Sequence, residues 1–204
     1  MGRWSLIATG VVVFALVASQ LLLPSLGAQR IEDRLTEGGG SAEVTLGAVP
    51  AVRLLFSDGE RLEVAARDLD LELDEREAVF DRLDGFTVVD ISVSDSAAGP
   101  FELTRFELQR DGAGPYSLLA SGETTASELT AFGFDQIELP GESFLDLLLD
   151  PFVEQVDVPL PIELEMELSS DDGRVEVVSG GGEVAGIPTG PLAELITSAI
   201  VLQL

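Results

Sequence analysis

Apolar and polar residues alternate through most of the chain beyond residue 41, as they do in strands that bury one face. The clearest run is Pro159–Ser169, where aliphatic residues alternate with Glu163, Glu165 and Glu167. Shorter runs of the same kind, bounded by Gly, Pro and Asp, predict further strands. The predicted strands are Ala42–Leu46, Arg61–Leu73, Phe86–Ser94, Phe101–Arg110, Tyr116–Glu123, Pro159–Ser169 and Arg174–Val178.

Two of these runs change parity along their length. In Arg61–Leu73, Leu62 and Leu69 fall on opposite faces of the strand. Such a change indicates a β-bulge, here near Ala65–Asp68, because one extra residue reverses the side on which the following side chains lie. Phe101–Arg110 changes parity in the same way. Since bulges bend strands, these patterns predict a curved sheet.

Helical patterns lie between and after the strands. Pro50–Phe56 suits one or two helical turns, and Asp74–Leu83 and Thr125–Phe132 each begin with a capping box. The last segment, Leu192–Leu204, is apolar around most of its circumference, so it must be covered on nearly all sides. These elements predict an α+β fold, a strongly curved antiparallel sheet wrapped around the apolar C-terminal helix. The alternative is a two-sheet β-sandwich with peripheral helices.

An uncharged apolar stretch, Leu6–Leu23, precedes all of these elements. As a helix it would be about 27 Å long, close to the thickness of the bilayer's hydrocarbon core. Two interpretations stay open. We favour an uncleaved transmembrane anchor, because the stretch is longer than the apolar core of a signal peptide. The other interpretation is a signal peptide that is cleaved near Gly27 or Ala28.

The charge distribution predicts the orientation of the chain in the membrane. Residues 1–28 contain one Arg and no acid, whereas the remainder has a formal charge of 10 − 37 = −27. The Arg-bearing end should stay in the cytoplasm and the acidic remainder outside. The predicted organisation is an anchor or signal peptide at 1–28, a short helix and glycine hinge at 29–40, and the sheet domain at 41–204. The protein is then a single-pass membrane protein or, after cleavage, a secreted one.

Composition narrows the function classes. The chain has no Cys and no His, which removes disulfides, thiolate or imidazole metal sites and Ser-His-Asp chemistry. We therefore expect no metal, no cofactor and no enzymatic activity. The formal net charge of −26 argues against nucleic acid as a partner, because phosphates would be repelled.

Charged side chains leave two further alternatives open. A hydrolase with paired carboxylates is the enzymatic alternative, although a run such as Glu163, Glu165 and Glu167 is usually a solvated strand face. Arg53 and Arg105 lie among apolar neighbours, where each would pair with a lipid phosphate or, given the many acids, with a surface carboxylate.

Two segments carry a resemblance to a known family. Residues 42–69 read AEVTLGAVPAVRLLFSDGERLEVAARDL, and residues 182–196 read GEVAGIPTGPLAELI. With the N-terminal apolar helix and the glycines at 38–40, the chain resembles the LmeA-like phospholipid-binding family of bacterial cell-envelope proteins, from about Gln29 to Leu204. The resemblance implies a tubular lipid-binding type of fold with an apolar groove for acyl chains. It also implies a role in handling envelope lipid or lipoglycan, and no catalytic residues.

The resulting hypothesis is a membrane-tethered protein that buries acyl chains of a phospholipid or another lipid between the sheet and the last helix. Each buried methylene would contribute about 0.8 kcal/mol. The alternative is a non-enzymatic structural or interaction module of the envelope, in which the same residues form a packed core and the protein partner is unknown. The candidate lipid-binding residues are Leu62, Val64, Val89, Ile91, Val93, Ile162, Leu164, Met166, Leu195, Ile196 and Ile200.

Overall fold

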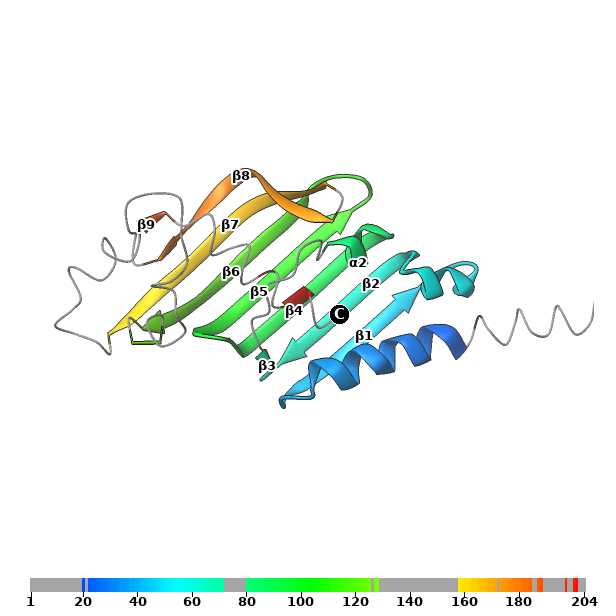
Figure 1. Ribbon diagram of the computed structural model, residues 1–204, viewed down its shortest axis with the longest axis horizontal. Coiled ribbons are helices and arrows are strands. Elements are labelled where there is room, and N and C mark those ends of the chain that lie inside the picture. Colours follow the sequence, from blue (N-terminus) through cyan, green and yellow to red (C-terminus); the bar gives the residue numbers. More distant parts are fainter. Residues whose placement is uncertain are drawn as a thin grey trace, which may run out of the picture.

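The strands that the structure describes form one open sheet (Figure 1). The computed structural model describes Gln20, residues 22–71, 80–125, 127–128, 158–171, 173–184 and 187–188, and Thr197, Ile200 and Val201. Eight strands follow one another in the order β1-β2-β4-β5-β6-β7-β8-β9, and β3 pairs with β4 beside this path. The elements are β1 (Ser41–Gly47), η1 (Ala51–Phe56), β2 (Gly59–Arg67), β3 (Asp70–Leu71), α2 (Asp81–Asp84), β4 (Phe86–Ala98), β5 (Phe101–Asp111), β6 (Tyr116–Thr125), β7 (Pro159–Asp171), β8 (Arg174–Val184) and β9 (Ile187–Pro188).

The sheet is mixed, which corrects the prediction that it is antiparallel throughout. β2 and β3 both pair with β4 in parallel, and the other neighbours in the order pair antiparallel. A parallel neighbour requires the chain to cross back to the end of the sheet at which it started. Here the connection between β3 and β4 includes α2, and it returns the chain so that β4 runs in the same direction as β2 and β3. Of the predicted helix Asp74–Leu83, positions 74–79 lie outside the described residues.

The predicted parity changes are present, and they lie in one line across the sheet. The β2–β4 register places Asp68 level with Asp95, and the β4–β5 register places Asp95 level with Thr104. Asp68 and Asp95 have left-handed backbone conformations, with φ of 55° and 48°. Because all three strands change parity at the same level, the apolar side chains stay on one face: Val93 and Phe106 before the line and Leu103 after it are all buried.

The prediction of a sheet wrapped around an apolar C-terminal helix is wrong. The mostly β structure is a single sheet with β1 and β9 at opposite ends of the strand order. The prediction took each parity change as a separate bend, whereas the changes lie at one level across β2, β4 and β5. Of the predicted helix Leu192–Leu204, the described residues are Thr197, Ile200 and Val201, and Ile200 and Val201 belong to the core cluster of the sheet's apolar face.

A helix over residues 22–35 lies beside β1, at the edge of the sheet (Figure 1). It includes the predicted cleavage positions Gly27 and Ala28, and Ala28 and Leu35 are part of the core. The Val44 N–H donates to Glu32 Oε1 at 2.9 Å, so this helix supplies an acceptor to the edge strand β1. None of the helices among the described residues is long and apolar enough to span a membrane. Of the predicted anchor, positions 6–19 and 21 lie outside the described residues.

Candidate functional site

The predicted lipid-binding residues on the strands share the apolar face of the sheet. All nine of the predicted residues that the structure describes belong to one core cluster, and none is more than 3% exposed. They are Leu62, Val64, Val89, Ile91, Val93, Ile162, Leu164, Met166 and Ile200. Leu195 and Ile196 lie outside the described residues. The alternation therefore identified the buried face correctly, and most of these side chains pack against one another.

One end of this apolar face opens into a pocket of about 270 Å³ next to helix 22–35. We call it the helix pocket. Side chains from helix 22–35, η1, β1, β2, α2 and β4 line it, and most of them are apolar. The lining residues are Gly27, Ile31, Arg34, Leu46, Leu54, Ser57, Leu62, Arg82, Leu83 and Phe86. Among the described residues, Leu62 is the one predicted lipid-binding residue that lines the helix pocket, while Val93 and Leu164 border depressions that include residues of the opposite face.

Helix 22–35 sits close to the sheet because of a glycine. A Cβ on Gly27 would lie 2.9 Å from Leu46 Cδ1, closer than van der Waals contact allows. Ile31 and Leu35 follow at helical spacing and continue the contact with the core. The helix thereby forms one wall of the pocket, and the sheet residues Leu46 and Leu62 line it as well.

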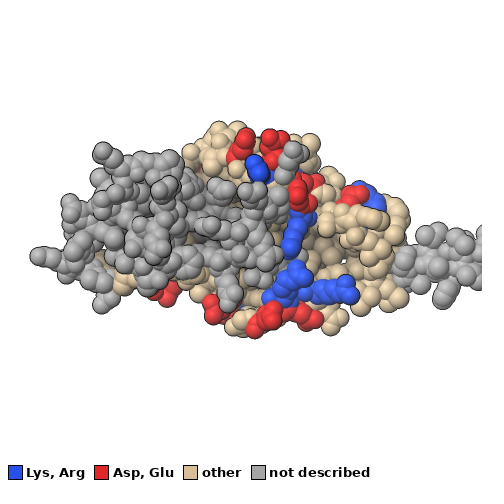
Figure 2. Space-filling model, viewed as in Figure 1, with Lys and Arg blue, Asp and Glu red and all other residues tan. Residues whose placement is uncertain are grey.

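Two arginines line the helix pocket among these apolar side chains. Arg34 comes from helix 22–35 and Arg82 from α2. Figure 2 shows blue side chains between the regions of these two helices, on a protein whose formal net charge is −26. The Arg34 side chain makes no hydrogen bond or ion pair with the residues that the structure describes. A guanidinium suits phosphate oxygens, because its N–H groups donate two parallel hydrogen bonds.

A partly buried polar cluster fixes α2 at the side of this pocket. The Tyr116 hydroxyl donates to Asp84 Oδ1 at 2.9 Å, and Arg110 pairs with the same oxygen at 3.2 Å. The Arg110 guanidinium lies 4.4 Å from the centre of the Tyr116 ring, and Phe80 meets that ring edge-on. Ser170 donates to the other Asp84 oxygen. These contacts tie α2 to β5, β6 and β7, and so hold Arg82 and Leu83 at the pocket.

Burial is the main reason that the pKa of Tyr116 lies far above its usual value, and the hydrogen bond to Asp84 and that carboxylate's charge act in the same direction. The nearby Arg110 charge opposes these effects. Tyr116 is 1% exposed, so its hydroxyl is buried and not at a solvated rim.

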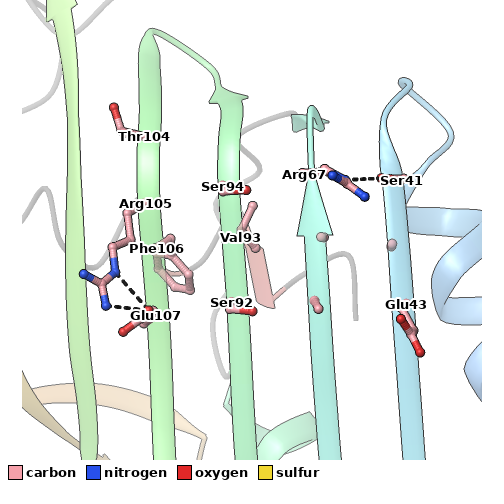
Figure 3. A pocket seen from close by; sticks show the side chains of 13 residues that line it. Ser41, Glu43, Arg67, Ser92, Val93, Ser94, Thr104, Arg105, Phe106 and Glu107 are labelled. Carbon is pink, nitrogen blue, oxygen red and sulfur yellow. Dashed lines mark hydrogen bonds and ion pairs between the residues drawn. The ribbon is translucent and has the colours of Figure 1, made fainter.

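The opposite face of the sheet is polar and open. Figure 3 shows a depression on this face of about 750 Å³, with short side chains such as Ser92 and Ser94 at its centre. Both of its arginines have partners within the face: the Arg105 Nη2 lies 2.7 Å from Glu107 Oε1, and the Arg67 Nε donates to Ser41 Oγ at 3.3 Å. We call this surface the outer face. It offers no apolar enclosure for an acyl chain.

The charged residues that the sequence analysis considered as lipid-phosphate or catalytic candidates lie on solvent-exposed surfaces. Arg53 donates to both carboxylate oxygens of Asp58, at 2.9 and 2.7 Å, so Arg53 and Arg105 are both in surface ion pairs. Glu163, Glu165 and Glu167 are exposed along β7, as expected for a solvated strand face. Among the described residues, no three His, Cys, Asp or Glu side chains are placed to hold a metal ion.

The helix pocket was not predictable as a unit from local patterns. Its lining comes from six elements, and the pattern within each element does not show that these elements meet. The sequence signal that could have indicated this pocket is Arg34, a basic residue near the apolar positions 31 and 35.

Comparison with known proteins finds no match: no family model, curated protein or solved structure is significantly similar to the chain. The resemblance to LmeA-like proteins therefore stays a prediction.

Proposed function

We propose that this chain is a membrane-tethered, extracytoplasmic lipid-binding protein that buries part of an acyl chain in the helix pocket. The observation that carries this proposal is the pocket's lining, in which aliphatic and aromatic side chains surround a space and two arginines accompany them. An apolar concavity with a few polar groups is the usual form of a small-molecule site. A phospholipid or a similar anionic acyl lipid matches both the apolar lining and the two arginines.

The size of the pocket sets how much lipid it holds. Its volume of about 270 Å³ lies just below the range of about 300–1,000 Å³ that is typical of ligand pockets, so we expect part of one chain to enter. Five buried methylenes would contribute about 4 kcal/mol, which corresponds to a Kd of about 1 mM. That affinity is sufficient for a protein held at the bilayer, because tethering raises the effective lipid concentration.

Arg34 is the residue that we assign to the lipid phosphate. Its side chain is exposed and has no ionic partner among the described residues, so binding an anion breaks no existing pair. Arg82 is half-buried at the same pocket and carries a second positive charge. The strongly acidic remainder of the domain disfavours general attraction to anionic lipid, so recognition would depend on this local pair of arginines.

A second candidate function is a structural or interaction module without a lipid ligand. It is favoured by the near-complete burial of the strand residues, since Ile91 and Leu168 are not exposed at all. The two candidates differ in the occupancy of the helix pocket. The module has no need of a lipid there, whereas the lipid-binding protein retains one.

Copurified lipid tests the proposal. The full-length chain would be extracted in a mild detergent, and its lipid quantified by mass spectrometry. We expect the wild-type protein to retain phospholipid and Leu54→Trp, whose larger side chain fills the pocket, to retain several-fold less. Val178→Trp, at an exposed position on β8, is the matched control and should retain the wild-type amount. Equal retention by all three proteins, or none by the wild type, would overturn the proposal.

A further inference from the structure

Six large apolar side chains are exposed near the start of helix 22–35 and around η1. Phe56 is 79% exposed and Leu55 is 65% exposed, values that are unusual for side chains of this size. Single exposed apolar residues need no explanation, but a group of them marks an interaction surface. We call this group the apolar patch. Its members are Leu22, Leu26, Val49, Val52, Leu55 and Phe56.

Gln20 joins the two sides of the apolar patch. Its Nε2 donates to the Ala48 carbonyl at 2.8 Å, and its Oε1 accepts from the Ala51 N–H at 2.7 Å. The beginning of the helix is thereby fixed to both ends of the Val49–Pro50 connection that leads into η1. In Figure 1 the start of the blue helix and the short cyan helix between β1 and β2 lie at the same end of the molecule.

The sequence before Gln20 indicates what covers this patch. The uncharged stretch Leu6–Leu23 is the predicted membrane segment, and it enters the described structure at the residue that bridges the patch. If that stretch lies in a bilayer, the surface around Gln20 lies at the same bilayer's boundary. The transfer of exposed Leu and Phe side chains from water into that boundary region is favourable.

We propose that the apolar patch docks into the outer leaflet of the bilayer that Leu6–Leu23 enters. Docking fixes the orientation of the sheet domain, because the patch and the tether would both engage the membrane. It also places the helix pocket at the lipid surface. η1 connects the two features, since Leu54 lines the pocket and the next two residues, Leu55 and Phe56, belong to the patch.

The docking surface is apolar and not electrostatic. Arg53, the basic residue of η1, is already paired with Asp58, and the part of the chain after residue 28 has a formal charge of 10 − 37 = −27. Docking should therefore occur on zwitterionic phosphatidylcholine vesicles and should change little with salt. This inference rests on the membrane tether in the proposed function but is independent of a lipid in the helix pocket.

The absence of native cysteine makes a site-specific test possible. The full-length variants Phe56→Cys and Leu55→Cys would each carry an environment-sensitive fluorophore in phosphatidylcholine proteoliposomes that contain nitroxide-labelled acyl chains. Val178→Cys is the matched control, because Val178 is an apolar residue of similar exposure (57%) on β8. We expect the lipid nitroxide to quench the fluorophore at 56 and 55 several-fold more strongly than at 178.

Each outcome has a distinct meaning. Flotation of the protein with the vesicles, combined with equal quenching at all three positions, would overturn docking and leave the tether intact. Failure to float would overturn both the tether and the docking. Energy transfer between fluorophores on different copies at position 56, without lipid quenching, would show that a second copy covers the patch. Lipid retention by the Leu54→Trp variant and the wild type tests the helix pocket separately.

Discussion

The two faces of the sheet are made by the same strands and differ in almost every physical property. Along β7, Leu164 and Met166 are buried in the core cluster, while Glu163 and Glu165 between them are exposed. The apolar face of the sheet, which we call the inner face, continues across the strands and opens at the helix pocket. Apolar side chains and two arginines meet there. The outer face carries exposed carboxylates, an ion pair between Arg105 and Glu107, and short polar side chains. The difference indicates that stability and the proposed lipid site both depend on the inner face.

The largest difference between the faces should appear when neighbouring residues on one strand are truncated. Leu164→Ala removes a side chain that is 2% exposed, and we expect it to lower the free energy of unfolding by about 2–5 kcal/mol. Glu165→Ala, on the outer face, should change it by about 0.5 kcal/mol or less. Urea denaturation in detergent, followed by circular dichroism, measures both values. Similar losses for the two variants would contradict the assignment of the faces.

Replacing either of two glycines on the β-strands by Ala should have different effects on stability, because one glycine is crowded and the other is not. A Cβ at Gly122 on β6 would lie 2.2 Å from the Glu102 carbonyl oxygen, so Gly122→Ala should destabilise the fold by about 1–3 kcal/mol. A Cβ at Gly181 on β8 meets no atom within 4 Å, and Gly181→Ala should be neutral or stabilise the fold by up to about 1 kcal/mol. Thermal unfolding of both variants tests the pair. A stable Gly122→Ala protein would show that β5 and β6 are farther apart than described.

The buried Tyr116 in the cluster beside α2 predicts a loss of stability at high pH. The pKa of Tyr116 is raised in the folded state, so above about pH 10 the unfolded chain releases the tyrosine proton while the folded chain keeps it. The free energy of unfolding should then fall by at most about 1.4 kcal/mol per pH unit. Tyr116 is the single tyrosine, and the chain has no Lys or Cys that titrates in this range.

Denaturation between pH 8 and 11, taken as a rough window around the ordinary tyrosine pKa, tests this dependence. Tyr116→Phe is the control, because it cannot ionise and should show a flatter profile. The variant should also be less stable at neutral pH, since it loses the hydrogen bond to Asp84. An unchanged slope in Tyr116→Phe would mean that another group causes the pH dependence.

The smallest effect is expected for an ion pair of the outer face. Arg105 and Glu107 are about half and one-third exposed, so water screens their attraction. Arg105→Gln should lower the free energy of unfolding by about 0.2–1 kcal/mol and should leave lipid retention unchanged. A larger loss of stability, or loss of the copurified lipid, would show that the outer face contributes more than a solvated surface does.

The strand faces could be predicted from the sequence because alternation is a local signal. Ile162, Leu164 and Met166 lie on the buried face as expected, and the predicted capping box at Thr125 is present, with the Glu128 N–H donating to Thr125 Oγ1 at 3.2 Å. Both features depend only on residues that are close in sequence.

The arrangement of the strands depends on distant residues, and there the prediction failed. Parity changes were recognised in two strands, whereas the one at Asp95 was missed because that strand was predicted to end at Ser94. No local pattern shows that Asp68, Asp95 and Thr104 align across three strands. Nor does the pattern reveal that β2 and β4 are parallel neighbours. The predicted wrapped sheet followed from treating these positions as independent bends.

The candidate site is predictable only in part for the same reason. Leu62 was identified from its strand, whereas Arg34 and Arg82 reach the helix pocket through the packing of two separate helices. Gly27 permits that packing, but its contact with Leu46 appears only when the helix is placed against β1.

Photo-crosslinking from the lipid tests the central claim most directly. Full-length protein in proteoliposomes would be irradiated with a phospholipid that carries a photoreactive group within its acyl chain, and the crosslinked peptides mapped by mass spectrometry. We predict crosslinks at the pocket residues Leu46, Leu54 and Leu62, and their loss in Leu54→Trp. Crosslinks confined to exposed residues such as Phe56 and Leu26, with none in the helix pocket, would contradict the proposal that the protein buries an acyl chain there.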